Sequence, residues 1–467
     1  MDARTGLHKL ASYPFQILTW VDSEGYPISV AVDGTVDPDA GLVRLPAPAG
    51  LQLPYDSEVS LTASHIRPQP GYGYDERRHV TVWGRAAPPD AAGELARSPG
   101  RAREVAVRAD AAWGWDEAEI PFPEYAERGV GQSRQYFAEL SAQLGRSVRP
   151  RLSPGWLTFR ATRLPFLSAT LIPVLLGIAI AAADGFFDPW FAAVTIAGAA
   201  CVHLGLNVAN DVFDTASGAD EANLNPTQYS GGSRVIQYGL VSFRRMAAIA
   251  FGFYAVAGLI GLYLLATRFS VALLVIGVLG FLVSIGYTAP PLKLVYRGLG
   301  ELAVAAGFGP MMLLGAYVVQ SGGTISTAAI VASLPVAILV ALILYVNEVP
   351  DRRGDAAAGK RTLPVRLSRD AVINGYVVAA VLAFAIVVLG VLTGTLPVPA
   401  LAVLVALPLV PRVYTGLRQY YDQPYGLMAF MGVNIRLHLI VGGLLLLAYL
   451  IVLIAAAFAP GVALYLR

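Results

Sequence analysis

The chain has 467 residues, of which 55% are hydrophobic and only 14% charged, and its formal net charge is +2. An ordinary soluble domain carries about 25% charged residues, so this composition excludes a purely soluble protein. The small net charge, without a run of Lys and Arg interleaved with aromatics, also argues against a nucleic-acid partner.

The charged residues are distributed unevenly along the chain. Residues 1–163 contain 38 charged residues, whereas residues 164–467, nearly twice as many, contain 28. We therefore predict a water-soluble domain over residues 1–150 and a lipid-embedded domain over residues 151–467. The stretch SVRPRLSPGW, with its two prolines, is the expected linker.

The soluble part has the pattern of a β domain. Short alternating apolar runs, such as FQILTWV, PISVAV, EVSLTAS and HVTVWG, are separated by turn sequences such as DSEG and DPDAG. This alternation is typical of antiparallel strands joined by hairpins. Residues 124–145 are richer in Ala, Glu and Arg and predict one or two helices. We expect a small, mainly β barrel or sandwich with appended helices.

The remainder of the chain predicts an all-α bundle of about nine transmembrane helices. Apolar stretches long enough to cross a hydrocarbon core of about 30 Å recur from Leu164 onward. They lie at approximately 164–183, 189–209, 246–266, 269–287, 299–319, 327–346, 371–393, 396–411 and 437–459. The eighth is the weakest, because prolines interrupt it.

The loops between these stretches predict the orientation. Loops after the second, fourth, sixth and eighth stretches contain 14 Lys and Arg, whereas the opposite loops and the C-terminus contain only Arg268 and Arg467. Lys and Arg are retained on the cytoplasmic side. We therefore expect a multi-pass protein of the cell inner (plasma) membrane, with the N-terminus and the Lys/Arg-rich loops in the cytosol.

Acidic residues are rare in the lipid-embedded part and are concentrated in two places. Seven of its 12 acids lie in two segments, at the ends of the second and sixth apolar stretches. The first segment, NVANDVFDTASGAD, contains Asn207, Asn210, Asp211, Asp214 and Asp220, and Glu221 follows it directly as the seventh acid. The second, NEVPDRRGDAAAGKRTLPVRL, contains Asn347, Glu348, Asp351, Asp355, Lys360 and Arg361.

The spacing within both segments favours a cation site. Asp211 and Asp214 are three residues apart, and Asp351 and Asp355 are four apart, so each pair can share a helical face. Mg²⁺ would neutralise such pairs, and two facing Mg²⁺ ions would suit a diphosphate. For either segment alone, a solvated loop end is the simpler interpretation. The near repetition of NDVFD as NEVPD instead indicates two related halves whose acidic ends converge.

A third segment, YTAPPLKLVYRGLGE at residues 287–301, supplies basic and phenolic candidates. A diphosphate leaving group gains negative charge as its C–O bond breaks, and cations beside it stabilise the transition state. Tyr287, Lys293 and Arg297 are the predicted catalytic residues. The alternative is that Lys293 and Arg297 only follow the charge bias of cytoplasmic loops.

Together with RATRLPFLSATLIPVLLG, these segments resemble the UbiA-type intramembrane prenyltransferases, most closely the bacterial members that act on 1,4-dihydroxy-2-naphthoate in menaquinone synthesis. The resemblance covers roughly residues 154–460. It implies a helical bundle around a cavity, Mg²⁺-dependent ionisation of a polyprenyl diphosphate, and attack of an aromatic acceptor on the allylic cation.

The resemblance also assigns roles to residues. It implies that two Mg²⁺ ions are bound by Asp211, Asp214, Asp220, Asp351 and Asp355. It implies substrate contacts for Asn207, Asn210, Arg160, Lys360 and Arg361. The segment YSGGSRV at 229–235 is similar to an FSGG-like sequence of the naphthoate enzymes.

One departure leaves the acceptor open. Naphthoate enzymes usually have two asparagines and an arginine before the first Asp of the second motif, whereas this chain has Glu348 and Pro350. Another aromatic ring or a glycerol-phosphate lipid is the alternative acceptor. A cation-coupled membrane transporter is the alternative from a different class.

The soluble part has its own resemblance. FQILTWVDSEGYPISVAV, EVSLTASHIRP and RRHVTVWGRA are similar to the split barrels of the pyridoxamine-phosphate-oxidase type. This implies binding of FMN or a deazaflavin, with Arg77, Arg78 and His79 as the cofactor-binding residues. A domain that only docks, or that forms a homodimer, is the alternative.

Two histidines, His203 and His438, lie within apolar stretches. An ionisable residue at membrane depth is by default a functional candidate. The alternative is a hydrogen bond between packed helices.

Overall fold

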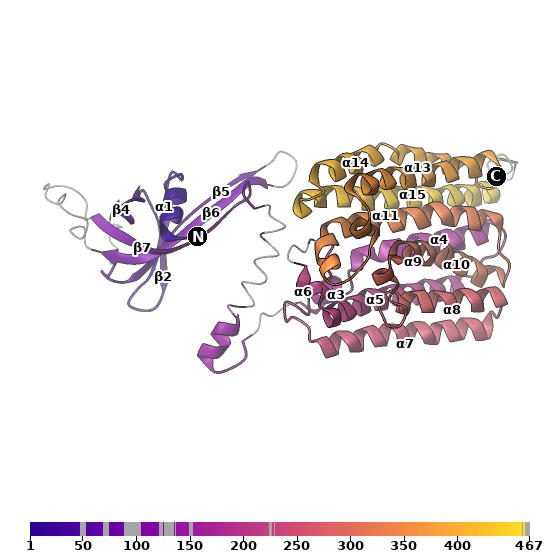
Figure 1. Ribbon diagram of the computed structural model, residues 1–467, viewed down its shortest axis with the longest axis horizontal. Coiled ribbons are helices and arrows are strands. Elements are labelled where there is room, and N and C mark those ends of the chain that lie inside the picture. Colours follow the sequence, from indigo (N-terminus) through magenta and orange to yellow (C-terminus); the bar gives the residue numbers. More distant parts are fainter. Residues whose placement is uncertain are drawn as a thin grey trace. The chain divides into compact units, whose positions relative to one another are not determined.

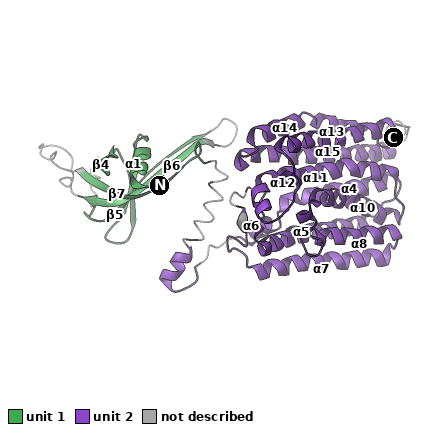
Figure 2. Cartoon of the chain, viewed as in Figure 1, with its two compact units in different colours: residues 1–126 green, residues 127–467 purple. Residues whose placement is uncertain are grey.

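A computed structural model of the chain describes residues 1–46, 53–68, 74–87, 104–120, 125, 135, 137–148, 153–223, 227, 229–459 and 461–462. The chain divides into two compact units, residues 1–126 and 127–467 (Figure 2). Of the helix predicted at 124–145, residues 137–144 are helical, and much of the rest lies outside the described residues. So do residues 149–152 of the predicted linker.

The N-terminal unit is a seven-stranded antiparallel sheet with one helix packed on it. Its elements are α1 (Ala3–Leu10), β1 (Gln16–Val21), β2 (Pro27–Val32), β3 (Thr35–Asp37), β4 (Leu42–Pro46), β5 (Glu58–Pro68), β6 (Tyr74–Ala87) and β7 (Glu104–Asp116). The strand order is β2-β1-β5-β6-β7-β4-β3, and the paired strands are antiparallel. The predicted β domain is confirmed.

The alternating sequence pattern explains how this unit forms a core. On β1, Leu18 and Trp20 are buried, whereas Ile17 is exposed on the other face. Helix α1 covers the buried face with Leu7 and Leu10, which are both fully buried. Burying a large apolar side chain contributes roughly 1.5–3 kcal/mol, so these few residues hold the helix on the sheet.

In the C-terminal unit, the regular elements among the described residues are helices, and the long helices run side by side (Figure 1). Its elements are α3 (Pro154–Ala161), η2 (Leu164–Leu167), α4 (Ser168–Ala183), α5 (Pro189–Ser217), α6 (Ala219–Ala222), α7 (Phe243–Thr267), α8 (Val271–Gly286), η3 (Leu294–Arg297), α9 (Gly300–Ala306), η4 (Gly307–Met311), α10 (Met312–Ser321), α11 (Thr327–Ala357), α12 (Leu363–Arg366), α13 (Arg369–Leu392), η5 (Val398–Ala406), α14 (Leu409–Tyr420) and α15 (Pro424–Phe458).

Eight helical stretches in the described chain are long and apolar enough to cross a membrane, and α8, with 16 residues, is a shorter apolar helix. Each predicted stretch corresponds to one of these nine. The number of membrane crossings itself stays a prediction. The weak eighth stretch is divided into the 3₁₀ helix η5 and the helix α14, as its prolines predict.

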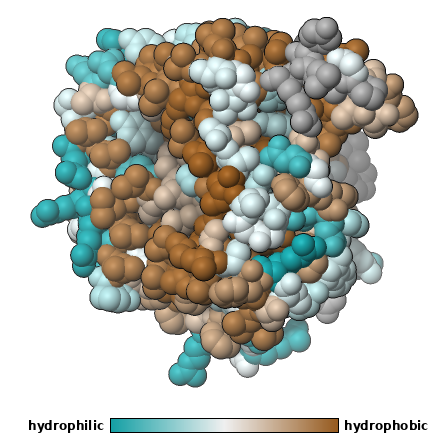
Figure 3. Space-filling model, turned by 90° about the vertical axis from the view of Figure 1, so that its right-hand side faces the viewer, coloured by the Kyte–Doolittle hydropathy of each residue, from teal (hydrophilic) through white to brown (hydrophobic). Residues whose placement is uncertain are grey.

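The outer surface of the bundle is apolar, as lipid contact requires. Large side chains such as Leu259, Val378, Leu392 and Val405 are more than half exposed. Figure 3 looks onto the end of the bundle near the C-terminus, and apolar side chains cover much of that face as well. The bundle therefore has the surface of a protein solvated by hydrocarbon.

The acidic pairs Asp211/Asp214 and Asp351/Asp355 lie on the last turns of long helices and not on loops. Helix α5 runs to Ser217 and ends at Gly218, whose φ of +76° forms a left-handed C-cap. Helix α11 continues to Ala357 and so includes Asp351 and Asp355, whereas Lys360 and Arg361 follow its end. A helical geometry fixes the direction of each acidic side chain more firmly than a loop would.

Candidate active site

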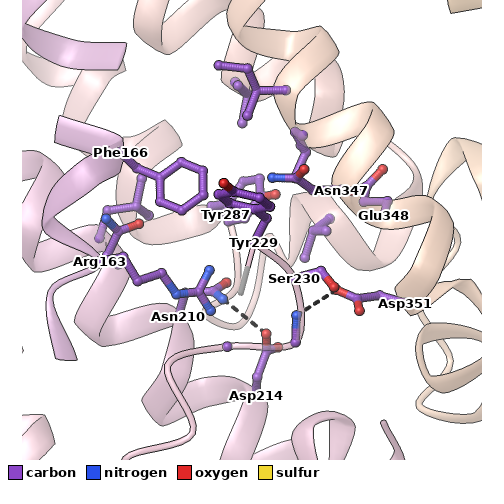
Figure 4. A pocket seen from close by; sticks show the side chains of 18 of the residues that line it. Arg163, Phe166, Asn210, Asp214, Tyr229, Ser230, Tyr287, Asn347, Glu348 and Asp351 are labelled. Atoms are coloured by element: carbon purple, nitrogen blue, oxygen red, sulfur yellow. Dashed lines mark hydrogen bonds between the residues drawn. The ribbon is translucent and has the colours of Figure 1, made fainter. Parts of the chain in front are cut away.

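A cavity of about 190 Å³ lies where α5 and α11 end, and we call it the polar cavity. Side chains of both acidic segments form its walls (Figure 4). Asn210 and Asp214 come from the first segment, and Asn347, Glu348 and Asp351 from the second. The two acidic ends therefore meet in space, as their repeated motif predicts.

The first segment is held by short polar contacts. The Asp211 carboxylate is buried and accepts a hydrogen bond from Arg163 Nη2 at 3.0 Å. Asp214 accepts one from Asn210 Nδ2 at 3.0 Å, drawn as a dashed line in Figure 4. Asn207 lines the same cavity and donates to the Thr162 carbonyl at 3.1 Å.

The second segment is fixed from across the cavity. Asp351 accepts hydrogen bonds from Asn223 Nδ2 and from the Gly231 amide, each at 2.8 Å. Asp355, one turn further along α11, also lines the cavity. Both donors to Asp351 lie in the residues that directly follow the first segment in the sequence. Their hydrogen bonds therefore connect the two motifs.

Lys360 joins the two segments directly. Its buried ammonium lies 2.8 Å from Asp214 Oδ1 and 3.6 Å from Asp355 Oδ1. Burial opposes its charge, but Asp214 and Asp355 outweigh burial and raise the pKa of Lys360 above its usual value. Lys360 is therefore a permanent cation inside the polar cavity.

The loop YSGGSRV contacts both motifs. The amide of Gly231 donates to Asp351, and the amide of Ser233, two residues on, donates to Asp211 at 3.2 Å. Gly231 and Gly232 have φ of +76° and +79°, which only glycine adopts readily. A Cβ on Gly232 would lie 2.9 Å from Asp220 Oδ1. The two glycines thus let backbone approach the carboxylates.

Negative charge is in excess at this site. Burial, and then the charges of Asp211 and Asp214, raise the pKa of Asp220 to about 8. The acids in and around the cavity are Asp211, Asp214, Asp220, Glu348, Asp351 and Asp355, and the buried or half-buried bases beside them are Arg163, Arg234 and Lys360. Such a site favours additional cations.

The carboxylates are suited to Mg²⁺ ions that also bind the phosphate oxygens of a ligand. Among the described residues, no three acidic, His or Cys side chains are placed to hold one ion together. Mg²⁺ needs only one or two carboxylates, because water and substrate phosphates complete its octahedron. Asp211 with Asp214, and Asp351 with Asp355, supply one pair of hard oxygen ligands each.

Asp211 does not line the polar cavity itself but contacts Arg163 at its wall, and four of the predicted basic residues lie outside the cavity. Arg160 donates through Nε to the Ser233 carbonyl at 3.1 Å. Arg297 is exposed and donates to the Pro291 carbonyl, and Arg361 is exposed. The ammonium of Lys293 lies 5.0 Å from the centre of the Tyr296 ring. The roles predicted for these four residues find no support in their positions.

Tyr287, in contrast, lines the cavity as predicted. Burial, and then the charges of Glu348 and Glu301, raise the pKa of Tyr287 well above its usual value. Its phenol is therefore a hydrogen-bond donor and not an anion at neutral pH.

The sequence reasoning missed several residues that line the cavity. They are Arg163, Asn223, Tyr229 and Ser230, while Asn347 and Glu348 were noted in the motif without a role. Arg163 is the second arginine of RATR, and its φ of +50° reverses the chain. The glycine pair of YSGG was the available signal for the loop.

A second, apolar cavity of about 520 Å³ adjoins the first and is called the apolar cavity here. It lies among α5, α7, α8, η4 and α10. Both cavities are lined by His203, Leu206, Tyr287, Val304 and Phe308. A ligand with a charged head and a long apolar tail matches this pair of cavities.

In the N-terminal unit, the three predicted cofactor ligands do not form one cluster. Arg77 is paired with Glu117, with Nη2 at 2.5 Å from Oε1. The guanidinium of Arg78 lies 5.3 Å from the centre of the Tyr13 ring. His79 packs against Trp113, with ring centres 4.9 Å apart. Flavin or deazaflavin binding therefore stays a prediction.

Comparisons with known proteins agree with this geometry. The UbiA prenyltransferase family matches residues 170–434. The 2-carboxy-1,4-naphthoquinone phytyltransferase of Synechocystis is 28% identical over 66% of this chain and 97% of its own length. The 1,4-dihydroxy-2-naphthoate octaprenyltransferase of Bacillus subtilis is 25% identical over 66% of this chain and 96% of its own length. Among solved structures, a UbiA homologue from Aeropyrum pernix is 17% identical, with a TM-score of 0.46, over 60% of this chain and 97% of that chain.

Proposed function

The chain belongs to the UbiA prenyltransferase family and is a multi-pass membrane prenyltransferase, and we propose that it transfers a polyprenyl group from its diphosphate to an aromatic acceptor of the 1,4-dihydroxy-2-naphthoate kind. The observation that carries this proposal is the meeting of two acidic helix ends around Lys360, at the mouth of an apolar cavity. The reaction would belong to menaquinone-type quinone synthesis.

The acceptor class rests on the relatives. The relatives from Synechocystis and Bacillus subtilis are both named for bicyclic naphthoate or naphthoquinone acceptors. Each aligns over almost its whole length with this chain. A bicyclic ring that carries oxygen substituents is therefore the acceptor we expect.

The polar cavity would bind the diphosphate. Arg163 and Lys360 are placed to donate to its oxygens, because each already holds an acidic partner at the cavity wall. Asp214, Asp220, Asp351 and Asp355 line this cavity and, together with Asp211 on the same helix as Asp214, would hold Mg²⁺. When bound, Mg²⁺ supplies positive charge that favours departure of the diphosphate.

The reaction begins with ionisation of the prenyl donor. The C–O bond at the allylic carbon breaks, and its electron pair leaves with the diphosphate. Lys360 and Arg163 stabilise the charge that develops on the oxygens. The rings of Phe166, Tyr229 and Phe308 line the cavity, where they would exclude water and stabilise the allylic cation through their faces.

Carbon–carbon bond formation completes the transfer. A ring carbon of the acceptor supplies the electron pair for the new bond to the allylic carbon. The ring then regains aromaticity by releasing the substituent of that carbon, as a proton or as carbon dioxide. The products are a prenylated ring, which is apolar enough to leave into the bilayer, and inorganic diphosphate.

We also propose an orientation for the site. The excess of Lys and Arg on one set of loops supports a polar cavity at the cytosolic side of the plasma membrane. The acceptor and the prenyl diphosphate would reach the cavity from that side. The N-terminal unit would then lie in the cytosol. Pairing of Arg77 with Glu117 favours docking or dimer formation by this unit over grip of a flavin phosphate.

The test is product analysis with the purified full-length protein. Geranylgeranyl diphosphate, Mg²⁺ and 1,4-dihydroxy-2-naphthoate are expected to give a prenylated naphthoid product by mass spectrometry, with none in EDTA. Parallel reactions with 4-hydroxybenzoate and with a glycerol-phosphate lipid test the alternative acceptors. Product from either of these, and none from the naphthoate, would contradict the proposed acceptor.

A further inference from the structure

His203 occupies the junction of the two cavities. It lies on α5, is 3% exposed, and lines both the polar and the apolar cavity. Its Nδ1 is 2.8 Å from the hydroxyl of Thr170 on α4. One ring nitrogen is thus fixed by a neighbouring helix.

The other ring nitrogen has no partner. Within the described part of the chain, His203 Nε2 is buried and makes no hydrogen bond. Buried polar atoms nearly always have a partner. Because His203, unlike His438, which is also unpartnered among the described residues, lines both cavities, a molecule bound there can supply the partner of Nε2. The contact between α4 and α5 uses only Nδ1, so helix packing does not explain Nε2.

The position of His203 along α5 indicates which bound group this is. His203, Asn207 and Asp211 follow at intervals of four residues, so they share one face of the helix. At 1.5 Å per residue, His203 lies about 12 Å deeper than Asp211. The diphosphate belongs at the Asp211 level, and the prenyl tail in the apolar cavity has no polar atom to offer.

We propose that His203 Nε2 makes a hydrogen bond to a ring oxygen of the aromatic acceptor, and that Thr170 orients the imidazole for this contact. The inference rests on the proposed function and names a binding residue of that same site. About 12 Å, from Asp211 to His203, accommodates the allylic carbon and one bicyclic ring.

Phe308 lies next to His203 in the wall of the acceptor subsite. Its ring stands edge-on to His203, with centres 5.5 Å apart and planes at 80°. It belongs to η4, a π-helical turn inside a span. Such turns are frequent at functional sites. An aromatic acceptor that lies against this pair of side chains would have one polar and one apolar neighbour.

The chain offers a matched control. His438, on α15, is also a buried histidine within a span, at 1% exposure. It lines neither the polar nor the apolar cavity. A substitution of His438 removes an equally buried imidazole from a span without changing the lining of either cavity.

The experiment measures initial rates of the full-length protein in nanodiscs with Mg²⁺, varying 1,4-dihydroxy-2-naphthoate and geranylgeranyl diphosphate in turn. We expect His203→Phe to raise the KM for the naphthoate by about tenfold and to leave the KM for the diphosphate within about twofold. His203→Gln, which keeps a polar group, should restore much of the loss. Thr170→Val, which retains the histidine, should raise the naphthoate KM by a smaller factor. His438→Phe should change neither KM.

Two results would overturn the inference. One is an active wild-type protein whose His203→Phe and Thr170→Val variants keep the wild-type naphthoate KM, which would mean that Nε2 binds only water. The other is an equal rise in both KM values, which would indicate a structural role. Failure of the proposed function is read separately, as wild-type protein that makes no prenylated naphthoate.

Discussion

The Lys360 ammonium lies 2.8 Å from the Asp214 carboxylate, although Asp214 belongs to α5 and Lys360 follows the end of α11. This contact places a cation between the two acidic motifs and holds α5 and α11 in register. Because Lys360 lines the polar cavity, its ammonium can also contact a phosphate that enters this cavity. Four predictions concern this site or the N-terminal unit.

Removing the Lys360 charge should reduce catalysis. Lys360→Gln is expected to lower kcat by about 10²-fold, because one donor to the developing diphosphate charge is lost. Arg361→Gln is the matched neighbour, since Arg361 is exposed and does not line the polar cavity. Rates measured at saturating substrates decide the matter, and equal losses in both variants would contradict the assignment.

Removing the metal ligands should abolish transfer without unfolding the protein. Asp211→Asn and Asp351→Asn each remove a hard ligand, so we expect rates to fall by about 10²-fold or more and EDTA to reproduce this loss. Added Mg²⁺ should restore the wild-type protein only. Asp370→Asn, at an exposed helix start, is the control. Full activity of wild-type protein in EDTA would refute the metal site.

The glycine loop should be intolerant of a side chain. Gly232→Ala combines a positive φ with a Cβ placed 2.9 Å from Asp220 Oδ1. Gly218→Ala has a similar φ of +76° but nothing within 4 Å of its Cβ. Both substitutions should lower the free energy of unfolding by about 1–2 kcal/mol, because a residue with a Cβ is strained in the left-handed backbone conformation. Only Gly232→Ala should also lose most of its transfer rate, and comparable rates in the two variants would contradict this.

The N-terminal unit should lose stability in acid through His79. Burial lowers the pKa of His79 below its usual 6.5. The unfolded state therefore binds more protons, and the stability contributed by neutral His79 is present above pH 6.5 and is lost as the pH falls through and below that value. Thermal unfolding followed by tryptophan fluorescence at pH 7.5 and pH 5 measures this. His79→Gln should flatten that pH dependence, and an unchanged profile would contradict it.

The sequence predicted the elements whose pattern is local. Alternation identified strands such as β1 and β2, and apolar length identified each helical stretch, because burial in a sheet and solvation by lipid both impose a short period on the chain. The acidic pairs were evident because charge is costly at membrane depth. The near repeat of NDVFD and NEVPD was enough to predict that the two ends meet.

The basic residues could not be sorted by the same reasoning. Arg160 and Arg163 are three positions apart, and only the left-handed backbone at Arg163, with φ of +50°, directs the second toward Asp211. Lys360 and Arg361 are adjacent, yet one is buried and the other exposed. A spacing of one or three residues does not determine which side chain faces a cavity when the chain between helices turns irregularly.

The lining of the apolar cavity has a consequence for the product. Leu262, Val278, Phe281 and Leu282 border this cavity, and each is at least half exposed on the surface of the bundle. A tail that fills the cavity can therefore continue sideways into lipid. A cavity of this kind does not limit the length of the prenyl tail. We therefore expect the number of isoprene units on the product to follow from the prenyl diphosphates that the cell makes.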